Sequence, residues 1–280
     1  MVGTQRKSGT RAILEWKAVG RSSLLVACIT SAGALVQNDA HADAPLGWQG
    51  GVPENGFSLG LGVAEVDPAY VGFHHRTDVF PLLGFRSDPF FFSGVGLGVV
   101  AFHNEVVTWS FMAAPQFMRL SGSDSPQLAG IKSRQWSING GTNLAIRQPW
   151  GETSFAVLHD ILDRNNGMQL RAQYGYPIPL GKGRLTPSVN VSWESANLTN
   201  YYYGVSPAEA RLGRPAYSPG SAVNPGAHLD YNLPLSQTWR LNAGASYTRF
   251  GRSIYTSPII DQNHTTGFNV SFSHVFGGGH

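Results

Sequence analysis

The chain has 280 residues with a formal net charge of +3 and a pI near 9.1, and 42% of its residues are hydrophobic. This length allows one large domain or two small ones, and the basic balance on its own would suggest an anionic or nucleic-acid partner. The first 42 residues, however, hold five of the 20 basic and two of the 17 acidic residues, so 15 of each remain beyond them. A near-neutral remainder excludes nucleic acid as the expected partner.

Residues 1–42 have the organisation of a secretory signal peptide. Five basic residues come before or at the start of the apolar run SSLLVACITSAGALV, and the small-residue sequence AHA follows as a cleavage site. We expect cleavage after Ala42, which leaves residues 43–54 as a short periplasmic segment. The only cysteine, Cys28, lies in the signal. Acylation of Cys28, as in a lipoprotein, is the alternative, but the apolar run before it is shorter than the roughly 7 to 15 residues of an h-region.

Beyond the signal, apolar and polar residues alternate with period two along almost the whole chain. Leu185 and Val189, for example, alternate with Ser188 and Asn190. This pattern predicts strands with one apolar and one polar face. Eleven such segments lie near residues 56–66, 77–87, 89–102, 105–119, 134–148, 152–162, 168–178, 184–196, 223–233, 237–250 and 262–276.

Such strands suit either a soluble sandwich or a closed membrane barrel, and three features favour the barrel. Most segments have about 10 to 14 residues, which is close to the length of a tilted membrane strand and longer than the usual strand of about 5 to 6. Connections alternate between tight turns and long loops, as in outer-membrane barrels. Aromatic residues typical of an interfacial girdle recur near segment ends, at Trp109, Trp136, Trp193, Tyr231, Trp239 and Tyr247.

Bacterial single-chain barrels have an even number of strands, so eleven segments cannot be the final count. Alternation blurs across the sequence FFFSGVGLGVV, which places the error between residues 77 and 119. We therefore predict an all-β, antiparallel up-and-down transmembrane barrel over residues 55–276, with 12 strands or alternatively 10. Residues 277–280 form a Gly-rich tail.

Three consecutive tyrosines, Tyr201, Tyr202 and Tyr203, precede a segment rich in Gly and Pro that looks too irregular for a helix or a strand. Counting strands back from the C-terminus puts residues 197–222 on the outer side. The tyrosines are then expected to form part of an aromatic belt at the membrane surface. The alternative is a ligand or partner contact made by the residues Tyr201, Tyr202, Tyr203, Gly204, Val205, Ser206 and Pro207.

The same stretch resembles the signature of the MipA/OmpV family of outer-membrane proteins, through YYYGVSPAEA followed by GRPAYSPG. Further similarity lies in DPAYVG, which contains Asp67, Tyr70 and Gly72, and in the sequence SPI before the last strand. The resemblance covers roughly residues 55–276, and His74-His75 departs from the family pattern.

The resemblance implies a protein of the bacterial outer membrane that is not an enzyme and has no cofactor. It also implies a scaffold that links a lytic murein transglycosylase to a bifunctional penicillin-binding protein. Other members are linked to osmotic response, adhesion or antibiotic susceptibility.

An enzyme is a competing interpretation, because some barrels hydrolyse lipids or peptides. Its candidate residues are His74, His75, Asp67, His159, Asp160 and Asp163. The sequence has no Gly-x-Ser-x-Gly, His-Glu-x-x-His or phosphate-binding glycine motif. We predict no catalytic, cofactor or metal site.

A pore is the third interpretation. Polar positions on the predicted inner face could line a channel or pair across a packed lumen; they include Arg171, Glu194, His228, Asp230 and Arg240. Barrels of about 8 strands fill with side chains and open channels have about 16 to 18. A monomeric 12-strand barrel in contact with outer-membrane lipid is therefore expected to have a narrow or occluded lumen.

Overall fold

The structure is a computed structural model that describes residues 56–67, 69–73, 76–94 and 96–276. The predicted signal peptide, the segment 43–54 and the tail 277–280 lie outside the described residues, as do His74 and His75. Within the described part of the chain, none of the helices has both the length and the apolar character needed to span a membrane.

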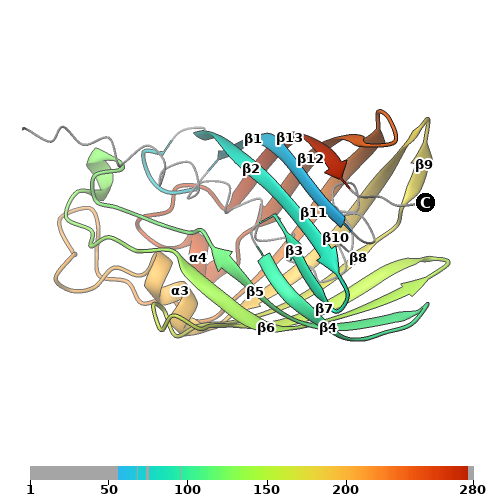
Figure 1. Cartoon of the computed structure of the whole chain (residues 1–280). Helices are drawn as coiled ribbons and strands as arrows, with labels where there is room; N and C mark the ends of the chain where they lie inside the picture. The colour runs from blue at the N-terminus through green and yellow to red at the C-terminus, as the bar shows by residue number, and fades with distance from the viewer. Residues whose placement is uncertain (1–55, 68, 74–75, 95, 277–280) are drawn as a thin grey trace, which may run out of the picture.

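The described residues form one closed antiparallel barrel (Figure 1). Its strands are β1 (Gly56–Asp67), β2 (Arg76–Ser87), β3 (Phe90–Ser93), β4 (Gly96–His103), β5 (Val107–Gln116), β6 (Ser137–Gln148), β7 (Gly151–Asp160), β8 (Met168–Gly175), β9 (Ile178–Leu180), β10 (Gly183–Glu194), β11 (Ala222–Pro234), β12 (Trp239–Arg249) and β13 (His264–Phe276). Both β8 and β9 pair with β10 and share one position in the wall. Because β11 pairs with β10 as well as β12, the barrel closes with 12 strands, as predicted.

The missing strand lies where the alternation blurred. The predicted segment 89–102 is two short strands, β3 and β4, joined by a turn in which Gly94 has φ +63°. The β3 pairing with β2 ends at Gly84, and the β4 pairing with β5 ends at Ala113. Pro81 in β2 lies outside the residues that pair with β3, and Pro115 in β5 lies outside those that pair with β4. Neither proline therefore interrupts a described pairing with the short hairpin of β3 and β4.

The wall is apolar outside and polar inside, as the alternation predicted. On β10, Ser188 and Ser192 are buried in the interior, whereas Val189 is 58% exposed on the outer surface. On β13, Phe268 and Val270 are exposed in the same way. Apolar side chains on an outer surface satisfy a lipid environment, so the barrel presents a lipid-facing band.

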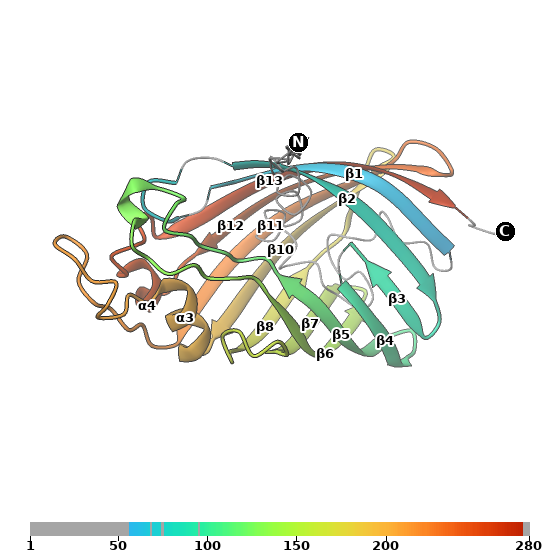
Figure 2. The same cartoon turned by 60° about the vertical axis from the view of Figure 1, so that its left-hand side comes forward.

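The two ends of the barrel differ (Figures 1 and 2). At one end, the described connections between strands are short turns, and there the first strand begins beside the last, with Phe57 opposite Phe276. The other end has the long loops, with the short helices η1 (Pro126–Leu128), α3 (Ala196–Tyr203) and α4 (Arg252–Tyr255). Short turns face the periplasm in outer-membrane barrels, so the long loops lie on the outer side.

The long loops pack on one another around a core of their own, which we call the outer loop cluster. Figure 1 shows α3, α4 and η1 gathered at this end. The buried members of the cluster are Ala69, Tyr70, Leu120, Leu128, Ile131, Leu198, Tyr202, Tyr203, Val205, Ala222, Ile254, Ile259 and Ile260. This core brings together segments that are nearly 200 residues apart in sequence, including the tyrosine stretch.

Candidate functional site: the outer loop cluster

The tyrosine stretch lies in the predicted outer loop of residues 197–222, but it forms a helix there, which the sequence analysis did not predict. In α3, Leu198 and Tyr202 lie four residues apart, as do Thr199 and Tyr203, and all four are buried. Residues four apart share one face of a helix, so this face packs into the outer loop cluster. The Thr199 hydroxyl also donates to the Gly220 carbonyl at 2.7 Å, which fixes the helix to the end of its own loop.

Two of the three tyrosines are core residues, which corrects the prediction of a membrane belt. Tyr202 is 0% exposed and Tyr203 is 4% exposed. The Tyr203 ring stacks on Tyr70 with 5.9 Å between centroids, and the Tyr70 hydroxyl lies 3.4 Å from the Tyr202 carbonyl as a donor. Burial raises the pKa of Tyr70, Tyr202 and Tyr203 above that of free tyrosine. These rings therefore stabilise the loops rather than contact headgroups.

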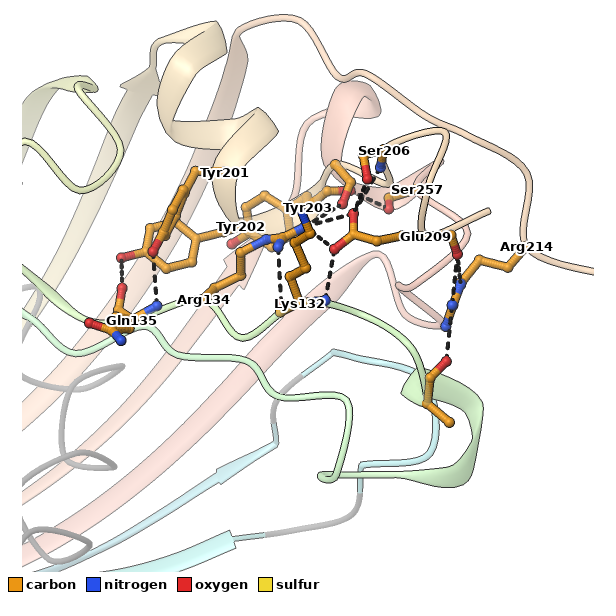
Figure 3. Close-up of polar contacts among 12 residues, drawn as sticks. Lys132, Arg134, Gln135, Tyr201, Tyr202, Tyr203, Ser206, Glu209, Arg214 and Ser257 are labelled. Carbon is orange, nitrogen blue, oxygen red and sulfur yellow. Dashed lines mark hydrogen bonds and ion pairs between the residues drawn. The ribbon is translucent and has the colours of Figure 1, made fainter. Parts of the chain in front are cut away.

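Tyr201 lies at the edge of the cluster and is held from three sides (Figure 3). Its hydroxyl accepts the Gln135 N–H at 2.9 Å, while the neighbouring Tyr202 hydroxyl donates to the Gln135 carbonyl at 3.1 Å. The Arg134 guanidinium lies 6.0 Å from the Tyr201 ring centre, within the range of a cation–π contact. The Tyr201 and Tyr202 rings meet edge to face at 4.9 Å. Tyr201 is thus fixed although it is only partly buried.

The residues Gly204, Val205, Ser206 and Pro207 of the motif follow α3 directly, and Val205 is part of the outer loop cluster. Val205 and Tyr217 exchange two backbone hydrogen bonds, each of 2.8 Å. A Cβ on Gly204 would collide with the Asn200 carbonyl, so the chain can turn this closely only with glycine. Ser257 in the last long loop donates to the Tyr203 carbonyl at 2.6 Å. The motif therefore ties two outer loops together.

Glu209 is the charged centre of the site (Figure 3). Its carboxylate pairs with Arg134 at 3.0 Å and accepts the Lys132 N–H at 2.8 Å. It also accepts both the N–H and the hydroxyl of Ser206, at 2.9 and 2.8 Å. Burial alone would raise the pKa of Glu209, but the hydrogen bonds from Arg134 and from two backbone N–H groups outweigh burial and lower the pKa to about 2.

Arg211 and Arg214 attach the segment between Val205 and Tyr217 to the loop that contains η1. Arg214 is 4% exposed and donates to the carbonyls of Glu209, Gln127 and Ala129. Arg211 donates to the Gln127 carbonyl at 2.7 Å. The sequence prediction missed Glu209, Arg134 and both of these arginines. The only signal was that Glu209 and Arg214 fall inside the quoted family motif.

The second family motif lies beside the first, as part of the same site. Tyr70 is in the cluster core, and Gly72 has φ +73°, where an added Cβ would collide with Gln127. Asp67, at the end of β1, accepts the Gln262 side-chain amide at 3.2 Å. The structure thus brings Tyr70 and the tyrosine stretch into contact, while Asp67 holds a loop at the rim.

A pocket of about 560 Å³ opens beside the tyrosine stretch. Ala216 and Ser218 at its edge are exposed to solvent. The lining residues come from three parts of the chain: Arg134, then Asn200, Tyr201, Gly204, Val205, Ser206, Pro207 and Glu209, and then Ala216, Tyr217 and Ser218. Pockets that bind small ligands have roughly 300 to 1,000 Å³, so the volume is within that range.

Among the enzyme candidates that the structure describes, the neighbours His159 and Asp160 point to opposite faces of the wall. His159 is exposed on the outer face of β7, whereas Asp160 points inward and is buried. The Asp160 carboxylate accepts the Ser137 hydroxyl and the N–H groups of Leu162, Asn165 and Asn166. It therefore shapes the turn between β7 and β8. Asp163 has φ +54° in that turn.

Metal ligands are likewise not assembled in the described part of the chain, where no three or more His, Cys, Asp or Glu side chains are grouped to hold an ion.

The predicted lumen residues do lie on the inner side of the wall and make short-range polar contacts. Glu194 is 7% exposed and accepts the Gln169 side-chain amide at 3.4 Å. The His228 ring bonds to Asn190 at 3.1 Å. Arg240 lies near the turn end, where it donates to the Ser236 carbonyl at 2.8 Å. Arg171 and Asp230 lie on β8 and β11.

Comparison with known proteins gives the family. A family model described as "MltA-interacting protein MipA" matches residues 59–276. The MltA-interacting protein of Escherichia coli (strain K12) is 28% identical over 228 residues, which is 80% of this chain and 91% of that protein. The outer membrane protein OmpV of Vibrio cholerae is 35% identical over 134 residues, 47% of this chain and 51% of that protein.

Among solved structures, the COG4313 outer membrane channel from Pseudomonas putida F1 has 14% identity and a TM-score of 0.41, covering 81% of this chain and 97% of that chain. The sequence match extends over almost every strand of the barrel. The chain belongs to the MipA/OmpV family of β-barrels and resides in the bacterial outer membrane.

Proposed function

We propose that this protein is a non-enzymatic scaffold that joins a lytic murein transglycosylase to a bifunctional penicillin-binding protein on the periplasmic side of the outer membrane. The observation that carries the proposal is the match to a protein named for its interaction with MltA, which aligns over 91% of its length. A match of this extent includes the turns as well as the strands, so we place the contact surface on the turns.

The scaffold role requires a surface at the turn end, and the hairpin of β9 and β10 offers one. Ile178 and Leu180 are 39% and 51% exposed, and the Tyr231 hydroxyl donates to the Leu180 carbonyl at 3.2 Å. Gly181 has φ +61°, as a tight turn requires, and Lys182 next to it is exposed. Exposed apolar side chains beside a cation suit the core and rim of a protein contact.

A non-enzymatic role fits the contacts of the polar groups. The Asp160 carboxylate has four hydrogen-bond donors, and Glu209 is paired with Arg134. A general base must be free to take a proton from a substrate within hydrogen-bond reach. These two carboxylates are committed to shaping loops instead.

A narrow pore is the second candidate, because the inner wall is polar. The loops around the outer end pack into a common core with Tyr202 fully buried. This packing favours an occluded outer end, so we expect a scaffold rather than a steady channel. Steady single-channel steps in a planar bilayer would favour the pore.

The lysines allow a direct test. Beyond the predicted signal the chain has only two, Lys132 in an outer loop and Lys182 in a turn, and both are exposed. An amine-reactive crosslinker applied to envelopes, followed by purification of the barrel and mass spectrometry, reports which end contacts a murein enzyme. We expect crosslinks from Lys182 to the transglycosylase or the synthase.

The matched variants are Lys182→Arg and Lys132→Arg, which keep the charge and remove the amine. Loss of the crosslink only in Lys182→Arg supports a periplasmic contact on this hairpin. Crosslinks that persist in Lys182→Arg and disappear in Lys132→Arg, or recovery of no murein enzyme, would reject the proposal.

A further inference from the structure

The pocket beside the tyrosine stretch lies at the opposite end of the barrel from the proposed scaffold surface. It is about 560 Å³ in volume, and most of its lining residues belong to the motif that carries the family resemblance. Neither the barrel wall nor a contact at the periplasmic turns requires a pocket at the outer end of the barrel. The pocket therefore indicates a separate role.

Two aromatic side chains form part of the lining, and both are held in place by other contacts. Tyr201 is fixed through its hydroxyl by the Gln135 N–H. The Tyr217 hydroxyl lies 3.0 Å from the Ser253 carbonyl as a donor and 2.7 Å from the Thr256 hydroxyl. Because these rings are already ordered, a ligand would lose little affinity to the cost of immobilising them.

Polar groups lie beside the rings. Asn200 and Ser218 line the pocket and are exposed, and the Ser218 hydroxyl donates to the Asn200 side-chain oxygen at 3.3 Å. In the described part of the structure, the Asn200 side-chain nitrogen has no acceptor. The pocket can therefore offer both a donor and an acceptor beside the two tyrosines of its lining.

The lining carries no net charge. Arg134 and Glu209 are its only charged residues, and they neutralise each other at 3.0 Å. The remaining bonds of Glu209 go to Ser206 and Lys132, which leaves it unavailable to a cation. An uncharged ligand is therefore preferred to an ionic one.

An extended peptide would also fit poorly. Peptides commonly add to an exposed strand edge through main-chain hydrogen bonds. The backbone groups of Val205 and Tyr217 that face each other are already paired at 2.8 Å. The wall formed by these residues thus has no free edge at this bridge.

We propose that this pocket binds a neutral saccharide at the outer surface of the cell. A pyranose ring has an apolar C–H face that can pack on a tyrosine ring and hydroxyl groups that can bond to Asn200 and Ser218. The proposal is independent of the scaffold role, because it concerns the outer loops alone.

The test uses the mature barrel purified in lauryldimethylamine oxide, a detergent without a sugar headgroup. Saturation-transfer NMR is recorded with methyl α-D-glucopyranoside, methyl β-D-galactopyranoside and N-acetylglucosamine, and with glucosamine and glucuronate as charged comparators. Ser218→Trp narrows the mouth at an exposed position, and Tyr201→Ala removes one wall. Tyr255→Ala is the control, because Tyr255 is a 39% exposed tyrosine in α4 outside the lining.

We expect saturable binding of at least one neutral sugar, weakened about tenfold or more in Ser218→Trp and in Tyr201→Ala but unchanged in Tyr255→Ala. Hydrogen exchange of the outer loops shows whether Ser218→Trp remains folded there. No saturable binding in the neutral panel overturns the proposal. Equal affinity in a folded Ser218→Trp, or stronger binding of both charged sugars, also overturns it.

Discussion

Replacing Glu209 by Gln should open the outer loops while leaving the barrel wall intact. The substitution keeps the shape of the side chain and removes its charge. Arg134 is only 12% exposed and would lose its partner at 3.0 Å, and the N–H groups of Lys132 and Ser206 would lose a charged acceptor. Leaving one member of a buried ion pair alone costs about 3 to 5 kcal/mol.

The pKa of Glu209 gives a second measure of the same interaction. It falls from 4.5 to about 2 on folding, and each unit corresponds to about 1.4 kcal/mol, so the ionised carboxylate contributes about 3 kcal/mol. Because the folded pKa is the lower one, this contribution is complete above about pH 4.5 and is lost as the pH falls towards 2. In Glu209→Gln this pH dependence should disappear.

The assay is amide hydrogen exchange of the purified barrel, with rates corrected for the intrinsic effect of pH. The Val205 and Tyr217 amides, which bond to each other across the loop, should exchange more than about a hundredfold faster in Glu209→Gln at neutral pH. Amides of β12 and β13 should not change. Asp261→Asn serves as control, because Asp261 is an exposed outer-loop carboxylate whose side chain makes no hydrogen bond within the described residues. Unchanged protection in Glu209→Gln would refute this account of the loops.

Other substitutions test the packing of the outer loop cluster. Tyr202→Ala removes a fully buried ring and should destabilise the loops by about 3 to 5 kcal/mol. Tyr202→Phe keeps the ring and loses the hydroxyl that donates to the Gln135 carbonyl, which should cost about 1 kcal/mol. Proteolysis rates of the outer loops measure both effects, and equal rates would contradict the assigned burial. Gly72→Ala places a Cβ against Gln127 at φ +73° and should lower the stability of the outer loops by more than about 1 kcal/mol. The measurement is the midpoint of loop unfolding, which should fall. An unchanged midpoint would show that the backbone can relax at this position.

The barrel could be predicted from the sequence because lipid and lumen impose opposite polarity on alternate residues of every strand. Residues such as Val189 and Ser188 carry that signal directly. It failed between β2 and β5, where β3 has only four residues and glycines in β4 have no side chain to indicate a face. The even-number rule for barrels recovered the correct total.

The outer loops could be predicted less well. Nothing local marks residues 196–203 as a helix, because tyrosine favours strands and the amphipathic pattern lasts only two turns. The burial of Leu198 and Tyr202 comes from loops elsewhere in the chain, and such context overrides local preference. The Arg134–Glu209 pair joins residues 75 positions apart, which no spacing rule reveals.

The central claim, a scaffold for murein enzymes, is tested most directly by reconstitution from purified components. The mature barrel is mixed in detergent with the lytic murein transglycosylase, the bifunctional penicillin-binding protein, or both, and the complexes are sized by analytical ultracentrifugation. The account predicts one complex that contains all three proteins and does not form between the two enzymes when the barrel is omitted. Separate sedimentation of the barrel from both enzymes would contradict the account.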